Sequence, residues 1–293
     1  MASLAHWIQA ARPKTLGAAV APVAVGTVIG SKISGDFHAG LALATLGSCV
    51  AIQVATNWFN DALDFIKGGD TAARIGPTRI TASGVVSART VMTAAVLVLI
   101  VAAALSVPLF LARGWPILAI GIPSLYFSYG YTGGPMPLAY RGLGELFVIL
   151  FFGLVAVTGS AFVQSGSWLV EALVAGVQIG CLSTVLIAVN NLRDISEDRQ
   201  TGKRTLAARF GVPFARMEIY LLALAPFVLG FYWLMHDREM AFAFPLPCLG
   251  ITFGLIQWIR KTDPGPLYNR FLALSGMQLL AFALLFCIGF ARS

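Results

Sequence analysis

Nine long apolar stretches constrain the fold of this 293-residue chain more than any other feature of its sequence. A stretch of about 20 apolar residues can cross a bilayer as a helix, because a helix satisfies its own backbone hydrogen bonds. The stretches are continuously apolar, whereas the strands of a membrane barrel alternate between apolar and polar residues. The expected spans are residues 15–33, 39–60, 90–111, 115–132, 143–164, 168–191, 214–235, 241–259 and 268–290.

These stretches predict an all-α, polytopic membrane protein. Hydrophobic residues make up 58% of the chain and charged residues only 11%, unlike the composition of soluble domains. We expect nine transmembrane helices in a bundle around a central cavity, with a polar cytoplasmic cap. No low-complexity linker divides the chain, so a single domain over residues 1–293 is expected.

The distribution of Lys and Arg predicts the orientation of the bundle, because basic residues gather in cytoplasmic loops. With the N-terminus in the cytoplasm, all but four of the 20 basic residues fall on the cytoplasmic side. The four exceptions are Lys32, Arg113, Arg238 and Arg292. Nine spans then place the C-terminus outside a bacterial-type inner membrane. The net charge of +7 follows mostly from this topology, and basic residues split among membrane-bound loops do not favour nucleic acid binding.

Two short polar clusters hold six of the 13 acidic residues, and each ends a long apolar stretch. Carboxylates are costly beside hydrocarbon, so a chain of this composition is expected to keep them for ion or substrate chemistry. The first cluster, at residues 57–70, comprises Asn57, Asn60, Asp61, Asp64 and Asp70. The second cluster, at residues 190–198, comprises Asn190, Asn191, Asp194, Glu197 and Asp198. They end the second and sixth spans, which predicts that both face the cytoplasm, that the chain has two pseudo-repeated halves, and that a polar cavity lies between these halves.

The composition of the clusters favours a Mg2+ site. The spacing of Asn57, Asp61 and Asp64 places them on one helical face, and the second cluster repeats this pattern from Asn190 onward. Carboxylate and amide oxygens without His or Cys suit Mg2+, whose shell is completed by water and ligand phosphates. The expected metal ligands are Asp61, Asp64, Asp194 and Asp198, with Asn57 and Asp70 as further candidates. The neighbouring cations expected to bind a diphosphate are Lys67, Arg79, Lys203 and Arg204.

The two clusters resemble the two Asp-rich motifs of the UbiA superfamily of intramembrane aromatic prenyltransferases. The matching residues are Asn60-Asp61-Ala-Leu-Asp64 and Asp194-Ile-Ser-Glu-Asp198. The first motif departs from the superfamily pattern, since Gly68 stands four residues after Asp64. This departure is typical of one branch, the 1,4-dihydroxy-2-naphthoate polyprenyltransferases (MenA type) of menaquinone synthesis. Other stretches similar to this branch are residues 11–16, 74–79, 131–135, 141–145, 190–194 and 202–206.

The resemblance implies a reaction and a set of site residues. Mg2+ and Lys203 would offset the charge of a departing diphosphate, and the prenyl tail would lie in apolar space among the helices. The allylic cation would be attacked by 1,4-dihydroxy-2-naphthoate, with loss of CO2, to give demethylmenaquinol. The expected substrate-binding residues are Asn57, Asn60, Lys67, Arg79, Tyr126, Tyr129, Tyr131, Arg141, Asn190, Asn191 and Arg204. The three tyrosines are either shields for the cation or ordinary interfacial anchors, and Glu145 is either an ion-pair partner of Arg141 or a substrate contact.

Several alternatives remain open at this stage. The acceptor is 1,4-dihydroxy-2-naphthoate on the resemblance, with 4-hydroxybenzoate and homogentisate as rivals, and the donor is a polyprenyl or a phytyl diphosphate. A cation-coupled transporter is the rival from another class of protein. Transporters place polar residues at the bilayer midplane on broken helices, whereas these acids gather at one face beside basic loops.

Overall fold

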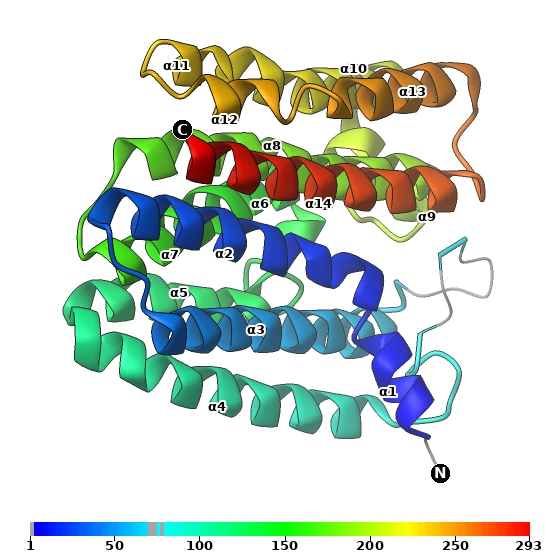
Figure 1. Ribbon diagram of the computed structural model, residues 1–293. Helices are drawn as coiled ribbons and strands as arrows, with labels where there is room; N and C mark the ends of the chain where they lie inside the picture. Colours follow the sequence, from blue (N-terminus) through cyan, green and yellow to red (C-terminus); the bar gives the residue numbers. More distant parts are fainter. Residues whose placement is uncertain (1–2, 70–74, 77–78) are drawn as a thin grey trace.

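The computed structural model describes residues 3–69, 75–76 and 79–293, and this part of the chain is built from helices (Figure 1). The candidate metal ligand Asp70 lies outside the described residues. The helices up to the middle of the chain are α1 (Leu4–Ala10), α2 (Pro13–Ser34), α3 (Ala39–Ile66), α4 (Ala88–Arg113), α5 (Trp115–Gly130), the 3-10 helix η1 (Leu138–Tyr140), α6 (Gly144–Val148), the π-helix η2 (Ile149–Val155) and α7 (Ala156–Ser165). The remaining helices are α8 (Val170–Arg193), α9 (Ile195–Gln200), α10 (Leu206–Leu229), α11 (Phe231–Leu234), α12 (Glu239–Ala243), α13 (Cys248–Lys261) and α14 (Tyr268–Arg292).

Eight helical segments in the described part are long and apolar enough to span a membrane. They are Pro13–Ser34, Ala39–Ile66, Ala88–Arg113, Gly144–Ser165, Val170–Arg193, Leu206–Leu234, Glu239–Lys261 and Tyr268–Arg292. The predicted span that is missing from these eight is residues 115–132. It corresponds to α5, which has only 16 residues. At about 1.5 Å per residue it is shorter than a hydrocarbon layer of about 30 Å. The all-helical membrane fold is therefore confirmed, with α5 as the short member of the predicted set.

Proline and glycine divide several of these segments. In α10, Gly211 adopts a φ of 85° two residues before Pro213, so the first turn of the helix bends away from the rest. Pro245 and Pro247 separate α12 from α13. The helix expected to continue through the second cluster also breaks, because α8 ends at Arg193 and α9 begins after a single intervening residue.

The helix α8 lies at the centre of the bundle, since 78% of its most apolar stretch is buried. Figure 1 shows α10 and α13 along one side and α3, α4 and α5 along the opposite side, with α2, α8 and α14 between them. Gly153 on η2 allows the closest approach to α8, because a Cβ atom at Gly153 would lie 2.4 Å from the Gly176 carbonyl oxygen. Small residues permit this kind of helix contact in membrane proteins.

An apolar cavity of about 170 Å³ lies among α2, α3, α4, α5 and the segment from α6 to α7. Tyr131, just beyond α5, lines one part of it, and Leu109, Ile117 and Val163 line another. The space is therefore apolar and lined by the first five spans, which differs from the polar cavity that we expected between the two halves. The tight contact of η2 with α8 explains this position, because it leaves no room on the α8 side of η2.

Candidate active site

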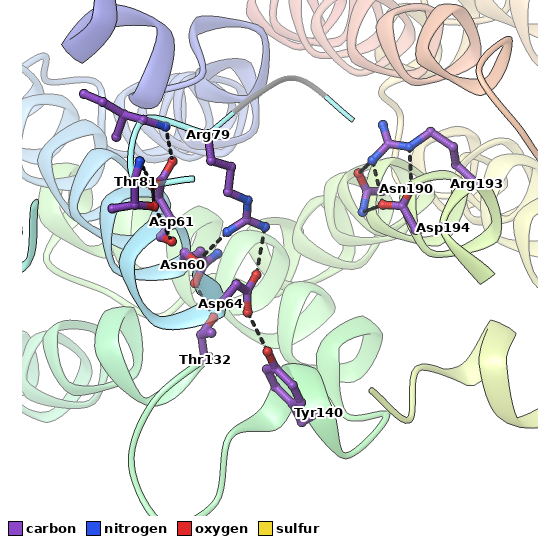
Figure 2. Close-up of polar contacts among 11 residues, drawn as sticks. Asn60, Asp61, Asp64, Arg79, Thr81, Thr132, Tyr140, Asn190, Arg193 and Asp194 are labelled. Carbon is purple, nitrogen blue, oxygen red and sulfur yellow. Dashed lines mark hydrogen bonds and ion pairs between the residues drawn. The ribbon is translucent and has the colours of Figure 1, made fainter. Parts of the chain in front are cut away.

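The first cluster is organised around Asp64, near the end of α3 (Figure 2). Its carboxylate accepts hydrogen bonds of 2.8 Å from Arg79 Nη2 and of 2.8 Å from the Tyr140 hydroxyl. Arg79 and Asp64 are both buried, and Arg79 also donates to the carbonyl oxygen of Asn60. The Asn60 side chain in turn accepts a hydrogen bond from the Thr132 hydroxyl. The segment after α3 thus folds back over the helix end and places a guanidinium beside the carboxylate.

Asp61 faces this returning segment. Its Oδ2 accepts from the backbone N–H of Ile80 at 3.1 Å, and its Oδ1 accepts from the N–H of Thr81 at 3.0 Å and from the Thr81 hydroxyl. Both carboxylate oxygens are therefore bound to the segment that carries Arg79 (Figure 2). The predicted helical face held Asn57, Asp61 and Asp64, but the two carboxylates have different partners.

The second cluster is organised around a buried arginine at the end of α8. Arg193 Nε and Nη2 each donate to one oxygen of Asp194 at 2.7 Å, so the pair is bidentate (Figure 2). Arg193 Nη2 also donates to Asn190 Oδ1 at 2.8 Å, and Nη1 donates to Asn269 Oδ1 at 2.7 Å. The side chain of Asn269, at the start of α14, donates onward to the Ile75 carbonyl oxygen at 3.3 Å. Asn269 thus connects the second cluster to the segment that follows the first.

Asp198, on α9, is bound differently from Asp64 and Asp194. Its Oδ2 accepts a hydrogen bond of 3.0 Å from the Thr205 hydroxyl, and no arginine is paired with it in the described structure. Burial raises the pKa of Asp198 to about 6, although Lys203 and the Thr205 hydroxyl act in the opposite direction. Of Asp64, Asp194 and Asp198, Asp198 is therefore the one that no arginine in the described structure neutralises, and the one with most need of a cation.

Two lysines, one from each half of the chain, converge on the ring of Tyr140. Lys67 Nζ lies 4.6 Å from the ring centroid and Lys203 Nζ lies 5.7 Å from it. Lys67 also donates to the Thr132 carbonyl oxygen. Because the Tyr140 hydroxyl binds Asp64, this residue links the first cluster to the lysine that follows the second cluster. Sequence reasoning missed Tyr140, whose only signal was its position directly before Arg141 in a stretch similar to the prenyltransferase branch.

Several other predicted residues are not bound to this group through their side chains in the described structure. Asn57 donates to the Ala11 carbonyl oxygen at 2.9 Å and to the Thr15 hydroxyl, which joins α3 to the start of α2. Arg141 and Arg204 have exposed side chains. Asn191, near the end of α8, has a different partner and donates to Glu145 Oε1 at 2.7 Å.

The three predicted tyrosines occupy three different environments. Tyr126 is 55% exposed on the outer surface of α5, and Tyr129 packs edge-on against Phe59. Of the three, Tyr131 alone lines the cavity. Burial raises the pKa of Tyr131, with smaller contributions from the charges of Glu145, Asp64 and Asp198. The next residue, Thr132, bonds Asn60 and Lys67, so Tyr131 lies where the cavity meets the first cluster.

Four phenylalanines that sequence reasoning missed also line the cavity, namely Phe127, Phe147, Phe151 and Phe152. Phe147 and Phe151 stack with their centroids 4.3 Å apart, and Phe127 meets Phe147 edge-on at 4.5 Å. Aromatic residues are common in any apolar helix, so spacing alone gave no reason to select these. Their ring faces provide a surface suited to an apolar chain or to a carbocation.

The four predicted metal ligands are not assembled into one cage. Among residues 3–69, 75–76 and 79–293, no three His, Cys, Asp or Glu side chains are grouped to hold a metal ion. The physical reason is that Arg79 and Arg193 occupy Asp64 and Asp194, and the segment at 80–81 occupies Asp61. The donor set itself is all-oxygen and suits a hard cation that arrives with ligand phosphates.

The arrangement suits an amphiphilic anion. An apolar cavity lined by aromatic rings ends beside carboxylates, and two lysines and Arg79 lie at the same end. A long hydrocarbon tail fits the cavity, and a polyanionic head group fits the charged end, with a divalent cation between the head group and the carboxylates.

Comparison with known proteins agrees with this description. Residues 19–290 match the model of the UbiA prenyltransferase family. A 1,4-dihydroxy-2-naphthoate octaprenyltransferase from Mycobacterium leprae is 39% identical over 97% of this chain and 95% of its own length. One from Bacillus subtilis is 35% identical over 78% and 71%. A UbiA homolog from Archaeoglobus fulgidus has the same fold at 16% identity, with a TM-score of 0.70 over 97% and 99% of the two chains, and its complex with GPP and Mg2+ gives 0.62 over 96% and 99%.

Proposed function

The chain belongs to the UbiA prenyltransferase family, and on that premise we propose that it transfers a polyprenyl chain from polyprenyl diphosphate to 1,4-dihydroxy-2-naphthoate. The proposed products are demethylmenaquinol, CO2 and diphosphate, which assigns the enzyme to menaquinone biosynthesis. The names of relatives that are 34–39% identical support this acceptor over 4-hydroxybenzoate and homogentisate. The observation that carries the proposal is the apolar cavity that reaches Tyr131, because the next residue, Thr132, binds Asn60 and Lys67 at the charged end.

The donor is proposed to bind with its tail in the cavity and its diphosphate at the charged end. Lys67 and Lys203 flank Tyr140 and provide two ammonium groups for the outer diphosphate oxygens. Arg79 is close enough to join them, since its guanidinium binds Asp64. Phe127, Phe147 and Phe151 form part of the cavity wall and contact the tail there.

The carboxylates fit Mg2+, and we propose that Asp64, Asp194 and Asp198 hold it together with the donor diphosphate. Mg2+ typically keeps several waters and binds through one or two carboxylates plus substrate phosphates, so the absence of a preassembled cage among the described residues agrees with this site. When bound, the ion would stabilise negative charge on the departing diphosphate. Asp61, held by Ile80 and Thr81, is proposed to position the segment that carries Arg79.

The reaction then follows from the placement of these groups. The bond between the prenyl C1 atom and the diphosphate oxygen breaks to give an allylic cation, and the ring carbon that carries the acceptor's carboxylate then forms a bond to C1. Lys67 and Lys203 stabilise the leaving group, and the Tyr131 ring faces the cavity end where the allylic cation forms. The bond from the ring to the carboxyl carbon breaks, and its electrons restore the aromatic ring as CO2 leaves. The apolar wall keeps water from capturing the cation.

A product assay tests this proposal. Purified protein in lipid with Mg2+ would be given a polyprenyl diphosphate and either 1,4-dihydroxy-2-naphthoate or 4-hydroxybenzoate, with EDTA as the control. We expect a prenylated naphthoquinone from the first acceptor only, and none with EDTA. Product from 4-hydroxybenzoate alone would support prenyltransferase activity and show that the proposed acceptor is wrong. A phytyl diphosphate offered in parallel identifies the donor class.

A further inference from the structure

Glu145 is a carboxylate that neither cluster accounts for. It lies in the first turn of the membrane-spanning segment Gly144–Ser165 and is only 4% exposed. We expected either an ion pair with Arg141 or a contact with substrate. The structure does not form that ion pair, because Arg141 is exposed and Glu145 instead binds the amide of Asn191. An ionisable residue buried at such a position is costly and points to function.

Only one oxygen of this carboxylate is satisfied. Oε1 accepts from Asn191 Nδ2 at 2.7 Å, and Asn191 is itself buried on α8. Oε2 is buried and has no hydrogen-bond partner in the described structure. Buried polar atoms are almost always paired, so an unpaired carboxylate oxygen indicates a group that binds there.

A second unpartnered group lies close by. No hydrogen bond to the Tyr131 hydroxyl is formed by the described residues, although Tyr131 lines the cavity. The hydroxyl lies against the start of the segment that carries Glu145, since a Cβ atom at Gly144 would be 2.9 Å from it. Of the charged groups around this hydroxyl, Glu145 contributes most to its raised pKa. Tyr131 is therefore in contact with both the cavity and the residue next to Glu145.

We propose that Glu145 and Tyr131 bind a ring hydroxyl of the aromatic acceptor. The hydroxyl donates to Glu145 Oε2 and accepts from the Tyr131 hydroxyl, which satisfies both unpartnered groups. Asn191 fixes the carboxylate from the other side. The arrangement also orients the acceptor, because a negative carboxylate repels the acceptor's own carboxylate toward the lysines at the charged end. The inference rests on the proposed function only in requiring a hydroxylated aromatic acceptor.

The hydrogen bond to Glu145 gives the acceptor more than a fixed position. A hydroxyl whose hydrogen is bound by a carboxylate pushes electron density into the ring, and an electron-rich ring carbon attacks an allylic cation faster. No proton leaves the substrate in this arrangement, so no further reactant is needed. The pair thus favours acceptors that carry a hydroxyl at the recognised ring position.

The test uses Glu145→Gln and Tyr131→Phe in the full-length enzyme in lipid, with steady-state kinetics for both substrates. We expect the acceptor KM to rise about ten- to hundredfold for Glu145→Gln and about three- to tenfold for Tyr131→Phe, with the donor KM unchanged. Tyr131→Phe is the safer variant for folding, since it keeps the ring and removes a hydroxyl without a partner. A purely structural role of that hydroxyl predicts no change at all.

Inhibition by acceptor analogues identifies the hydroxyl. The probes are 1-hydroxy-2-naphthoate and 4-hydroxy-2-naphthoate, each of which lacks one ring hydroxyl. The unmodified enzyme should bind one at least about tenfold more tightly than the other, and Glu145→Gln should bind both alike. The double variant should bind the analogues no more weakly than Glu145→Gln alone, because both residues hold the same hydroxyl group.

Glu171→Gln is the matched control. Glu171 lies on α8 like Asn191, but 20 residues away, or about 30 Å along the helix, and its loss should leave the acceptor KM unchanged. The inference is overturned if both variants keep the acceptor KM, or if donor and acceptor KM rise together. If the unmodified enzyme prenylates a different hydroxylated acceptor, the proposed acceptor is wrong, and the same variants test Glu145 on that compound.

Discussion

At the scale of single residues, Asp61 and Asp64 of the first cluster have different partners although they are only three positions apart. Asp64 is held by side chains that can exchange it for a ligand, namely Arg79 and Tyr140. Asp61 is held by two backbone N–H groups and a hydroxyl of the segment at 80–81. A carboxylate bound to backbone donors has a fixed structural role, because the donors cannot move without unfolding the segment.

Asp61→Asn therefore tests the division between structure and metal binding. The amide would place an N–H group against the backbone N–H donors of Ile80 and Thr81, at a cost of about 1–3 kcal/mol. We expect a lower melting temperature and an unchanged Mg2+ concentration for half-maximal activity. Asp198→Asn should show the reverse, with a near-normal melting temperature and a higher Mg2+ requirement. Equal Mg2+ dependence in both variants would contradict the division.

Sequence patterns predicted which residue types form this site but not how they pair. The spacing of Asp61 and Asp64 indicates a shared helical face, yet it cannot show that a segment 15 to 20 residues later folds back onto both of them. Tyr140 was missed for the same reason, since its contacts with Asp64 and with the lysines are made across long sequence separations. The sequence position of Tyr131 was enough to propose it as a site residue. Only the structure shows that Tyr131 lines the cavity whereas Tyr126 and Tyr129 do not.

At the scale of helices, the close contact of η2 with α8 decides where the cavity lies. A Cβ atom at Gly153 would lie 2.4 Å from the Gly176 carbonyl oxygen and 2.7 Å from the Gly180 Cα atom. These are backbone atoms, so they cannot move aside as a flexible side chain can. The same π-helix carries Phe151 and Phe152, which line the cavity on its other side.

Gly153→Ala should therefore push η2 away from α8 and into the cavity. We expect a lower melting temperature than that of the unmodified enzyme. The KM should also rise more for a long-chain donor than for a short-chain donor, because a long tail occupies the narrowed space. The matched control is Gly254→Ala on α13, where a Cβ atom meets nothing within 4 Å. That variant should be neutral or slightly stabilised, by up to about 1 kcal/mol, because alanine is the better helix former. Equal stability of the two variants would contradict the importance of the contact.

The apolar stretches predicted the helices but not their internal geometry. Hydrophobicity gives the length of a span, whereas the π-helix from Ile149 to Val155 depends on packing against the glycines of α8. The break at Asp194 likewise could not be predicted, because no glycine or proline lies there. It coincides with the bidentate pair of hydrogen bonds from Arg193 to Asp194. The span expected at residues 115–132 is also shorter in the structure, where α5 ends at Gly130.

At the scale of the whole molecule, the two halves of the chain meet through Asn269. Its side chain accepts from Arg193 of the second cluster and donates to Ile75, in the segment after the first cluster. This residue at the start of α14 had no role that the sequence could suggest. Since the donor diphosphate is proposed to bind both clusters at once, their relative position sets the donor affinity.

Asn269→Ala should weaken donor binding without unfolding the enzyme. The side chain is exposed, so we expect a small change in melting temperature and a donor KM that rises about two- to tenfold. The acceptor KM should stay unchanged, because Glu145 and Tyr131 do not contact this group. Arg270→Ala, at the neighbouring exposed position on the same helix, is the control and should match the unmodified enzyme. An effect confined to the acceptor would exclude this role.

The orientation of the molecule in its membrane follows from the same two ends of the bundle. The clusters and the site lie at one end, whereas Arg113 donates to the Val163 and Gln164 carbonyl oxygens at the opposite end. The basic residues predict that the end with the clusters faces the cytoplasm. In intact spheroplasts, a membrane-impermeant maleimide should label Ser167→Cys and leave Ala82→Cys unlabelled until the cells are opened. Both positions are exposed, and Ser167 follows α7 at the same end as Arg113 whereas Ala82 follows α3 at the same end as the clusters. The unmodified protein, with four free cysteines, sets the background. The reverse pattern of labelling would place the site outside, where cytoplasmic prenyl diphosphates could not reach it.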